Sequence, residues 1–337
     1  MAELQPTYGN FTLRGQVVWL DRNNAYDENT SENGYLYRRI RFGVKTEEKN
    51  IVQVELFQTK FDTVTLQNKE TKQRDKEVPY GEHHNLPEGY QLFMPIRLGI
   101  EQDEEGNNIK KQLIPFDAIK YIKENLKNGD TVFIFGSPRF SEYTDRDGNV
   151  VPQVAFEPRG IYLTSTPYED EEFEGQSTFE QTIVLNRTVK QDDKLMVHAY
   201  IINDKHGNFV PHTFYIDIKK FKKFAMNVHK LKFGTVLNAE GIIHHTVEEK
   251  EVEQDDAWGE SPVKNTITNV IKSLEITRVD KPSKEDIAKY TKDDFVKKPK
   301  EEEPKDDDPF NEDDDDWGSS PSDDDPFVAD DDPFADL

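Results

Sequence analysis

The sequence predicts a mainly β protein of two tandem five-stranded barrels, each with one helix, followed by a disordered acidic tail. Three observations support this fold class. Segments in which apolar and polar residues alternate recur up to about residue 280, and a period of two is typical of half-buried strands. Each half of that region holds one stretch with apolar residues at helical spacing. After residue 298 the chain becomes rich in Asp and poor in apolar residues, which is typical of disorder.

The composition limits the class of protein. A chain of 337 residues has room for two domains and a tail, and its 21 Phe and 13 Tyr suit sheets and flat binding faces. The absence of Cys excludes disulfides and thiolate zinc sites and fits a reducing cytoplasm. No apolar run has the length of a membrane span, and no signal peptide is recognisable. We therefore expect a cytoplasmic protein with no membrane partner.

The first domain is predicted over residues 9–166. A helix is expected at 115–126, where apolar residues recur at helical spacing before Gly129. Residues 21–33 are interpreted as a polar loop, and residues 60–113 as an insertion with hairpins of its own. The predicted strands are, in chain order, 11–19, 35–42, 51–57, 131–135 and 150–164, the last two joined by a loop at 140–149.

The second domain is predicted over residues 178–281, after an acidic linker at 167–177, and it repeats the order of the first. A helix is expected at 219–231, and the strands at 179–189, 195–202, 209–218, 235–248 and 266–277. Residues 126–132 match 231–236 loosely, which favours a tandem duplication. Three strands, a helix and two strands is the order of the OB-fold, a five-stranded Greek-key barrel. Residues 282–337 are assigned to the tail.

The strand around residue 40 has two chemically different faces. Leu36, Ile40 and Phe42 share one face, while Tyr and Arg residues alternate on the other. Rings beside cations are typical of surfaces that stack bases and neutralise phosphates. The strand at 194–201 repeats the pattern, and the helix begins with the basic run Lys219–Lys223. An exposed strand of ordinary β formers and a solvated helix face are the alternatives. The predicted DNA-binding residues are Arg14, Trp19, Tyr35, Tyr37, Arg39, Arg41, Arg139, Tyr143, Lys194, His198, Tyr200, Tyr215, Lys219, Lys220, Lys222 and Lys223.

The tail repeats one short phrase, Asp-Asp-Asp-Pro-Phe, ending at Phe310, Phe327 and Phe334. Residues 299–337 hold 18 acidic residues and two Lys, whereas residues 1–298 carry a net charge of only −8. Like charges at this density oppose folding, so we expect the rings to be exposed. A solubilising extension would need the charge alone, whereas an aromatic anchor beside carboxylates suits a basic apolar pocket on a partner. The predicted partner-binding residues are Phe310, Trp317, Phe327, Asp330, Asp331, Asp332, Pro333 and Phe334.

This phrase resembles the acidic tip of bacterial single-stranded DNA-binding proteins, which ends in an Asp-Asp-Asp-x-Pro-Phe type signature. The resemblance covers about the last tenth of the chain and implies a tail that recruits enzymes of DNA replication, recombination and repair. Here the residue before Pro is missing and Ala335-Asp336-Leu337 follow the last Phe, so a pocket that grips a terminal Phe carboxylate would not be satisfied. Two OB-like domains in one chain suggest a phage- or virus-encoded relative, in the host cytoplasm.

Other interpretations remain open at this stage. The pattern D-D-x-W-G-x-S-P occurs around both Trp258 and Trp317 and suggests a second partner motif or a mimic of DNA. No nucleophile, phosphate loop or metal motif is recognisable, so we expect no enzyme, no cofactor and no small-molecule substrate. His83 and His84 lack a spaced third ligand and are interpreted as surface residues rather than metal ligands. The main expectation is a protein that binds single-stranded DNA with little dependence on sequence. The alternative functions are an acidic-tailed chaperone or scaffold for basic proteins, and an RNA-binding OB-fold protein.

Overall fold

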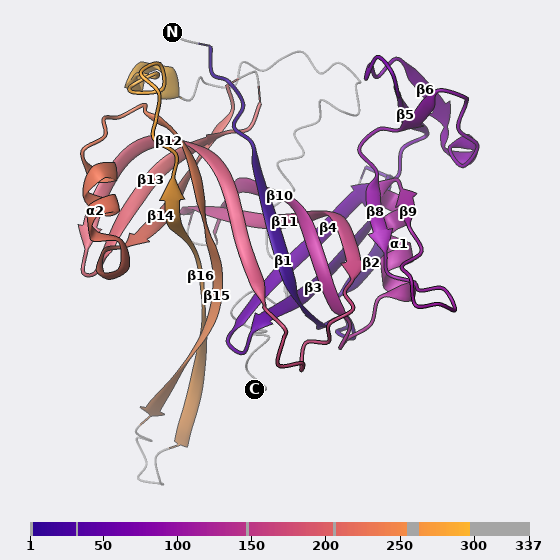
Figure 1. Ribbon diagram of the computed structural model, residues 1–337, viewed down its shortest axis with the longest axis horizontal. Coiled ribbons are helices and arrows are strands. Elements are labelled where there is room, and N and C mark those ends of the chain that lie inside the picture. The colour runs from indigo at the N-terminus through magenta and orange to yellow at the C-terminus, as the bar shows by residue number, and fades with distance from the viewer. Residues whose placement is uncertain (1–2, 32, 146–147, 205–206, 255–262, 297–337) are drawn as a thin grey trace. The chain divides into compact units, whose positions relative to one another are not determined.

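The computed structural model describes residues 3–31, 33–145, 148–204, 207–254 and 263–296 (Figure 1). Strands dominate, and the described residues contain two α-helices, so the predicted mainly β class is confirmed. None of the helices in these residues is long and apolar enough to cross a membrane. The chain divides into two compact units. We call residues 11–137 and 156–177 the N-terminal unit, and residues up to 10, 138–155 and from 178 onward the C-terminal unit.

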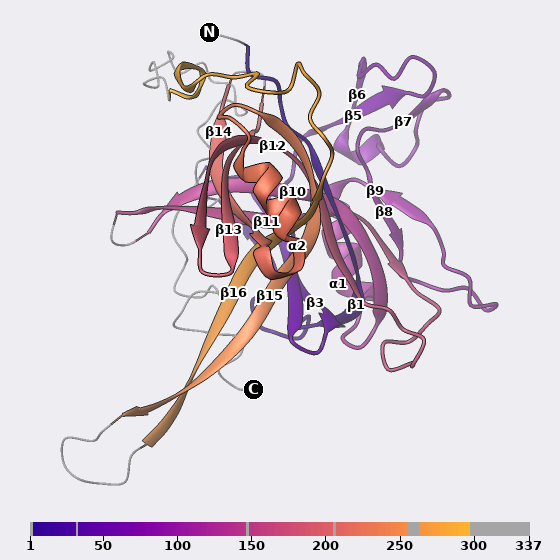
Figure 2. The ribbon, with the colours of Figure 1, turned by 60° about the vertical axis from the view of Figure 1, so that its left-hand side comes forward.

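The C-terminal unit contains a closed ring of five strands. Its elements are β12 (Gln176–Gln191), β13 (Lys194–Ile202), β14 (Phe209–Asp217), α2 (Ile218–His229), β15 (Val236–Gln254) and β16 (Val263–Val279). Antiparallel pairing joins β12 to β13, β13 to β14, β12 to β15 and β15 to β16. A parallel pairing of β14 with β16 at Tyr215 and Glu275 closes the ring. Helix α2 contacts β13 and β14, and the β15–β16 hairpin continues beyond the ring (Figures 1 and 2).

Alternation along the strands builds the core of this unit. Every second residue of β13 from Leu195 to Ile201 is buried, as predicted from the period of two. The rings of Phe179 and Phe214 meet inside the ring of strands with centroids 5.9 Å apart. Helix α2 starts at an Asp217 N-cap whose carboxylate accepts hydrogen bonds from the backbone N–H groups of Lys219 and Lys220. The N-cap explains why the helix begins directly after β14.

His212 is a half-buried ionisable group beside this core. Its ring lies 4.8 Å from Phe140 and 5.2 Å from Phe214 between centroids. Its Nδ1 is shielded from water and has no hydrogen-bond partner among the described residues. Burial lowers the pKa of His212 from 6.5 to about 4, because the charged imidazolium loses its hydration.

We expect the stability of the C-terminal unit to fall with acid between pH 6.5 and 4. Since the unfolded chain takes up the proton at a higher pH than the folded chain, stability is fully present above the unfolded pKa and is lost as the pH falls. A decrease from pH 7 to pH 5 should lower the free energy of unfolding by about 2 kcal/mol, measured by urea denaturation. His212→Leu should flatten this pH dependence and His229→Leu, at an exposed histidine, should not. Equal slopes in both variants would contradict the assignment.

The N-terminal unit has a related meander with additions. Its main elements are β1 (Gly9–Val18), β2 (Tyr26–Thr30), β3 (Leu36–Glu47), β4 (Asn50–Thr59), α1 (Pro115–Asn125), β10 (Thr131–Thr144) and β11 (Val150–Leu163). Strand β3 pairs with β1 and β4, and β1 also pairs with β10, all antiparallel. Helix α1 contacts β3 and β4. Its predicted apolar stripe is buried at Phe116, Ile119 and Ile122, and Pro115 suits the first helical position because its missing N–H needs no partner there.

Two details of the first predicted domain differ from the prediction. The polar segment expected as a loop at 21–33 contains β2, which pairs with β3 along its whole length. A polar strand at the edge of a meander has no apolar alternation to reveal it. The loop expected at 140–149 is also shorter, because β10 continues to Thr144.

The insertion forms a small sheet (Figure 2), and this sheet has a buried core of its own. Strand β5 (Thr63–Asn68) pairs with β6 (Lys76–Pro79) and β7 (Tyr90–Leu92), and the short 3-10 helix Tyr80–Glu82 follows β6. Its buried cluster consists of Val64, Leu66, Val78, Leu92 and Ile114. Next come β8 (Ile96–Gly99), which pairs in parallel with β11, and β9 (Lys111–Leu113). The insertion therefore contributes one hairpin to the main sheet.

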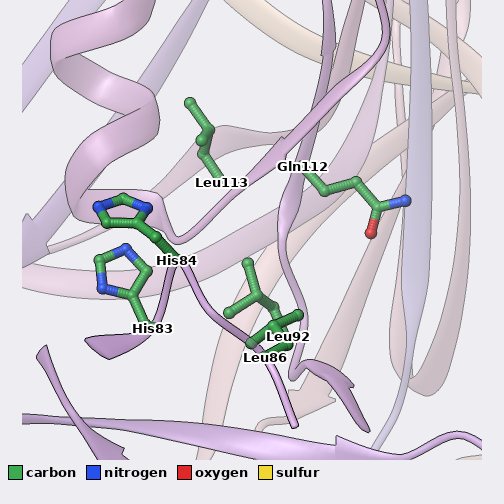
Figure 3. Close-up of a pocket in the computed structure, with 6 residues that line it drawn as sticks. All are labelled: His83, His84, Leu86, Leu92, Gln112 and Leu113. Atoms are coloured by element: carbon green, nitrogen blue, oxygen red, sulfur yellow. The ribbon is translucent and has the colours of Figure 1, made fainter. Parts of the chain in front are cut away.

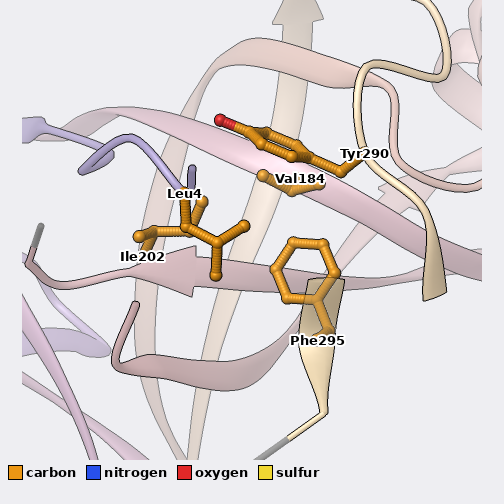
Figure 4. Packing of buried hydrophobic residues seen from close by; sticks show 5 residues of the cluster. All are labelled: Leu4, Val184, Ile202, Tyr290 and Phe295. Carbon is orange, nitrogen blue, oxygen red and sulfur yellow. The ribbon is translucent and has the colours of Figure 1, made fainter. Parts of the chain in front are cut away.

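Within the C-terminal unit, the segment after β16 packs against β12 and β13. Residues 280–296, which we call the C-terminal strap, end in the short 3-10 helix Lys292–Phe295, where Thr291 and Asp294 form a capping box. Tyr290 and Phe295 are buried with Leu4, Val184 and Ile202 (Figure 4). Residues 282–296 had been assigned to the disordered tail. Two aromatic anchors in an otherwise polar sequence are the local signal that the assignment overlooked.

Candidate nucleic-acid interface

Aromatic rings and arginines share the outward face of β3 and β4. Every second residue of β3 from Ile40 to Thr46 is buried, so the residues between them lie on the other side of the sheet. On that side Tyr37 stacks on Phe57 of β4, with ring centroids 5.4 Å apart and an angle of 28° between the planes. Arg39 pairs in register with Phe57, and Arg41 with Glu55. We define the β3–β4 face as Trp19, Tyr37, Arg39, Arg41 and Phe57.

Trp19 lies at the opposite end of this face from Tyr37. The residue follows β1 with φ of +71°, a left-handed conformation that costs a non-glycine residue roughly 1–3 kcal/mol. A Cβ atom placed on Gly43 would lie 2.6 Å from Cε3 of Trp19, so the indole packs directly on the backbone of β3. The guanidinium of Arg22 lies 4.5 Å from the centroid of the indole, within range of a cation–π contact. The absence of a side chain at Gly43 therefore makes room for the ring.

Both arginines of the β3–β4 face are paired with carboxylates. Arg39 Nη2 lies 3.7 Å from Asp27 Oδ2, and Arg41 Nε donates to Glu55 Oε2 at 2.5 Å. The Tyr37 hydroxyl donates to Asp27 Oδ2 at 3.0 Å. Burial and this hydrogen bond raise the pKa of Tyr37, so its ring is neutral at physiological pH. The carboxylates orient the guanidinium groups, and a phosphate would have to replace them as partners.

Other predicted residues of the N-terminal unit lie apart from this pattern. Tyr35 precedes β3 and is 41% exposed. The guanidinium of Arg14 on β1 lies 5.1 Å from the ring centroid of Phe173, and Gln16 on the same strand donates to Glu169 at 2.6 Å. Residues of the acidic linker therefore contact the outward side of β1.

In the C-terminal unit the outward position predicted for Tyr215 is wrong. Its side chain is buried, its hydroxyl donates to the buried carboxylate of Glu275 at 3.3 Å, and Lys194 Nζ lies 4.3 Å from its ring centroid. Burial and the nearby Glu275 raise the pKa of Tyr215 to about 12. The parallel contact of β14 with β16 at this residue explains the burial, because the strand alternation alone does not reveal where a ring of strands closes.

Tyr200 is also covered, in this case by the C-terminal strap. Phe295 stacks on it with centroids 4.4 Å apart and planes 15° apart, and Phe209 meets it edge-on at 5.1 Å. His198, on the same side of β13, forms a hydrogen bond with Thr213 at 3.0 Å. Burial, together with the charge of Arg187, lowers the pKa of His198, so this histidine is neutral near pH 7. The two-sided pattern of β13 is as predicted, but its polar side is partly occupied.

The lysines of α2 differ in their surroundings. Lys219 Nζ lies 2.6 Å from Asp193, and Lys220 Nζ lies 3.5 Å from Glu275. Lys222 and Lys223 are exposed. Arg139 and Tyr143 lie on the part of β10 that belongs to the C-terminal unit, and both are partly exposed.

Sequence reasoning missed several rings. Phe57 belongs to the β3–β4 face, and its signal was available, because it alternates with the buried Val54 and Leu56. Phe133, Phe135 and Tyr162 form a second aromatic row on β10 and β11, with the rings of Phe135 and Tyr162 parallel to within 12° at 6.3 Å. The two sides of β10 are not distinguishable from the sequence, because residues 132–135 are apolar at every position.

The predicted partner-binding residues lie outside the described residues. These are Phe310, Trp317, Phe327, Asp330, Asp331, Asp332, Pro333 and Phe334, and the loop around Trp258 lies outside them as well. The tail motif therefore remains a prediction from the sequence.

These observations define a mainly β protein with a five-stranded ring in one unit and a ring-and-arginine face in the other. The sequence profile of the YorF family matches residues 10–311, so the chain belongs to the YorF family. No curated protein matches the sequence. Among solved structures, the chain is similar to a deletion mutant of the single-stranded DNA-binding protein from Thermus aquaticus, with 12% identity, a TM-score of 0.38 and coverage of 83% of this chain and 97% of that one. The wild-type form of that protein gives 9% identity, a TM-score of 0.37 and coverage of 83% and 95%.

Proposed function

We propose that this protein binds single-stranded DNA with little dependence on sequence, and that the β3–β4 face is its main contact surface. The observation that supports this proposal is the alignment of Trp19, Tyr37 and Phe57 with Arg39 and Arg41 on one side of two paired strands. Every base has an aromatic face, so bases of any sequence can stack on such rings.

In this mechanism the arginines exchange partners when DNA binds. Asp27 and Glu55 hold Arg39 and Arg41 in the free protein, and backbone phosphates replace the carboxylates in the complex. The chain has a net charge of −24, so DNA binding depends on a few locally placed cations. Asp27 and Glu55 keep two of them, Arg39 and Arg41, oriented before DNA arrives. Because DNA releases bound counterions in this exchange, affinity falls as salt rises.

We further propose two OB-fold domains, at 9–166 and 178–281, as predicted from the element order. A second, weaker contact surface on the C-terminal unit would consist of Lys194, His198, Lys222 and Lys223.

The tail would compete with DNA through its carboxylates and recruit enzymes of DNA replication, recombination or repair through its Phe motifs. A tethered competitor is effective because its local concentration is high.

A titration of the full-length chain with oligo-dT, followed by Trp and Tyr fluorescence, tests this function. We expect quenching, affinity at least about tenfold higher than for duplex DNA of equal length, and a slope of log affinity against log salt of about −1 to −3. A chain ending at residue 298 should bind more tightly at low salt if the tail competes. Equal binding of single and double strands would overturn the proposal. Preference for oligo-U over oligo-dT would favour RNA, and binding of basic proteins alone would favour a chaperone.

A further inference from the structure

The insertion and helix α1 bring two histidines and a carboxylate together. His83 follows the 3-10 helix of the insertion and is 4% exposed, so its interpretation as a surface residue is wrong. Asp117 lies in the first turn of α1, and its Oδ2 is 2.9 Å from His83 Nε2. The exposed ring of His84 lies over that of His83, with centroids 3.9 Å apart (Figure 3). One ligand atom from each of the three residues lies within 4.8 Å of the other two.

The hydrogen bonds of His83 indicate which of its nitrogens is available. Nδ1 faces the backbone carbonyl of Tyr80 within hydrogen-bond distance, and a carbonyl only accepts, so Nδ1 carries a proton. In the neutral ring the lone pair of Nε2 then points at a carboxylate oxygen 2.9 Å away. Two acceptors approach this closely only when a cation, either a proton or a metal ion, lies between them. A carbonyl on the opposite nitrogen is also the usual support of a metal-binding histidine.

The surroundings favour a metal ion over a proton. A proton needs only His83 and Asp117, whereas the site also holds the nitrogens of His84. Asp117 uses its other oxygen, Oδ1, to accept from the Tyr80 hydroxyl at 2.5 Å, which leaves Oδ2 for a ligand. Arg38 lies 3.7 Å from Oδ1 but is engaged more closely by Glu28, at 3.1 Å. A metal would therefore join three groups that the fold already brings together.

We propose that His83, His84 and Asp117 form a zinc site that joins the insertion to α1. Imidazole nitrogen and carboxylate oxygen are ligands of Zn²⁺, at about 2.0–2.2 Å. With His83 Nε2 and Asp117 Oδ2 2.9 Å apart, the angle between their bonds to one such ion is near 90°. A tetrahedral angle requires the two atoms to lie a few tenths of an ångström farther apart. Three protein ligands leave a fourth position for water. A small pocket beside the two rings is lined by Leu86, Leu92, Gln112 and Leu113 (Figure 3).

The test is a Zn²⁺ titration of the full-length chain by calorimetry, with millimolar Mg²⁺ present to occupy the oxygen ligands of the acidic tail. We expect one Zn²⁺ per chain that Mg²⁺ does not displace, and a higher melting temperature on binding. His84→Ala removes an exposed side chain and should weaken this binding at least about tenfold. Asp117→Asn should do the same, and His229→Ala, at an exposed histidine far along the chain, should have no effect.

Each alternative result overturns the zinc site. Absence of Zn²⁺ binding in the presence of Mg²⁺ would mean that a proton alone joins His83 to Asp117. Binding that is unchanged in both His84→Ala and Asp117→Asn would place the metal elsewhere. The inference goes beyond DNA binding, because oligo-dT affinity and Zn²⁺ affinity are measured separately and either one can fail alone.

Discussion

The double substitution Tyr37→Ala with Phe57→Ala is expected to weaken oligo-dT binding at least about 30-fold. The two rings stack on each other at 5.4 Å and adjoin Arg39, so they would form one platform for bases. Each stacked base contributes about 1–3 kcal/mol, and losing two contacts at the lower end of this range corresponds to about 30-fold, or more when the stacks are stronger. Fluorescence titration at fixed salt measures the change, and Trp19 remains as the probe.

The control for this variant is Tyr8→Ala. Tyr8 is 75% exposed and does not belong to the β3–β4 face, so its removal should leave the affinity within about twofold, as expected for a substitution away from the contact. Circular dichroism should show that the double variant keeps its strand content, since both rings are only partly buried. Unchanged affinity in a folded double variant would remove the β3–β4 face from the proposal.

Replacing Phe295 by Ala is expected to destabilise the C-terminal unit by about 3 kcal/mol. Phe295 is 9% exposed and packs on Tyr200, Phe209 and Tyr290, and truncation of a buried Phe to Ala costs about 3–5 kcal/mol, less where the site collapses. Loss of this anchor should also release the C-terminal strap. Urea denaturation measures the stability, and limited proteolysis between residues 280 and 296 measures the release.

Val296→Ala is the matched control, because the neighbouring side chain is 64% exposed. It should leave both stability and proteolysis unchanged. Release of the strap would also uncover Tyr200, so Phe295→Ala distinguishes two roles for that ring. Tighter oligo-dT binding in Phe295→Ala would support Tyr200 as a stacking residue that the strap covers, whereas unchanged binding would limit Tyr200 to the core.

The strands with a clean period of two were the most predictable elements. In β13 every second residue from Leu195 to Ile201 is buried and the residues between them are not, as expected, because one side of the strand faces a core. In β3 Ile40 and Phe42 are buried as expected, whereas Leu36, at the start of the strand, is only half-buried. Helix α1 was likewise predictable, since its start at Pro115 and its apolar spacing are local signals. Strand β2 was missed because an edge strand with polar residues is held by backbone hydrogen bonds to β3 rather than by its own pattern.

Which side of the sheet each residue of β3 occupies was decided by the sequence alone. Alternation along one strand is a local property, so the shared face of Tyr37, Arg39 and Arg41 follows from their spacing. What lies against such a side chain was decided only by the tertiary structure. Phe295 covers Tyr200, Glu275 binds Tyr215, and Asp117 reaches His83 across 34 residues of sequence. Those contacts join segments that are distant in the chain, and no local spacing encodes them.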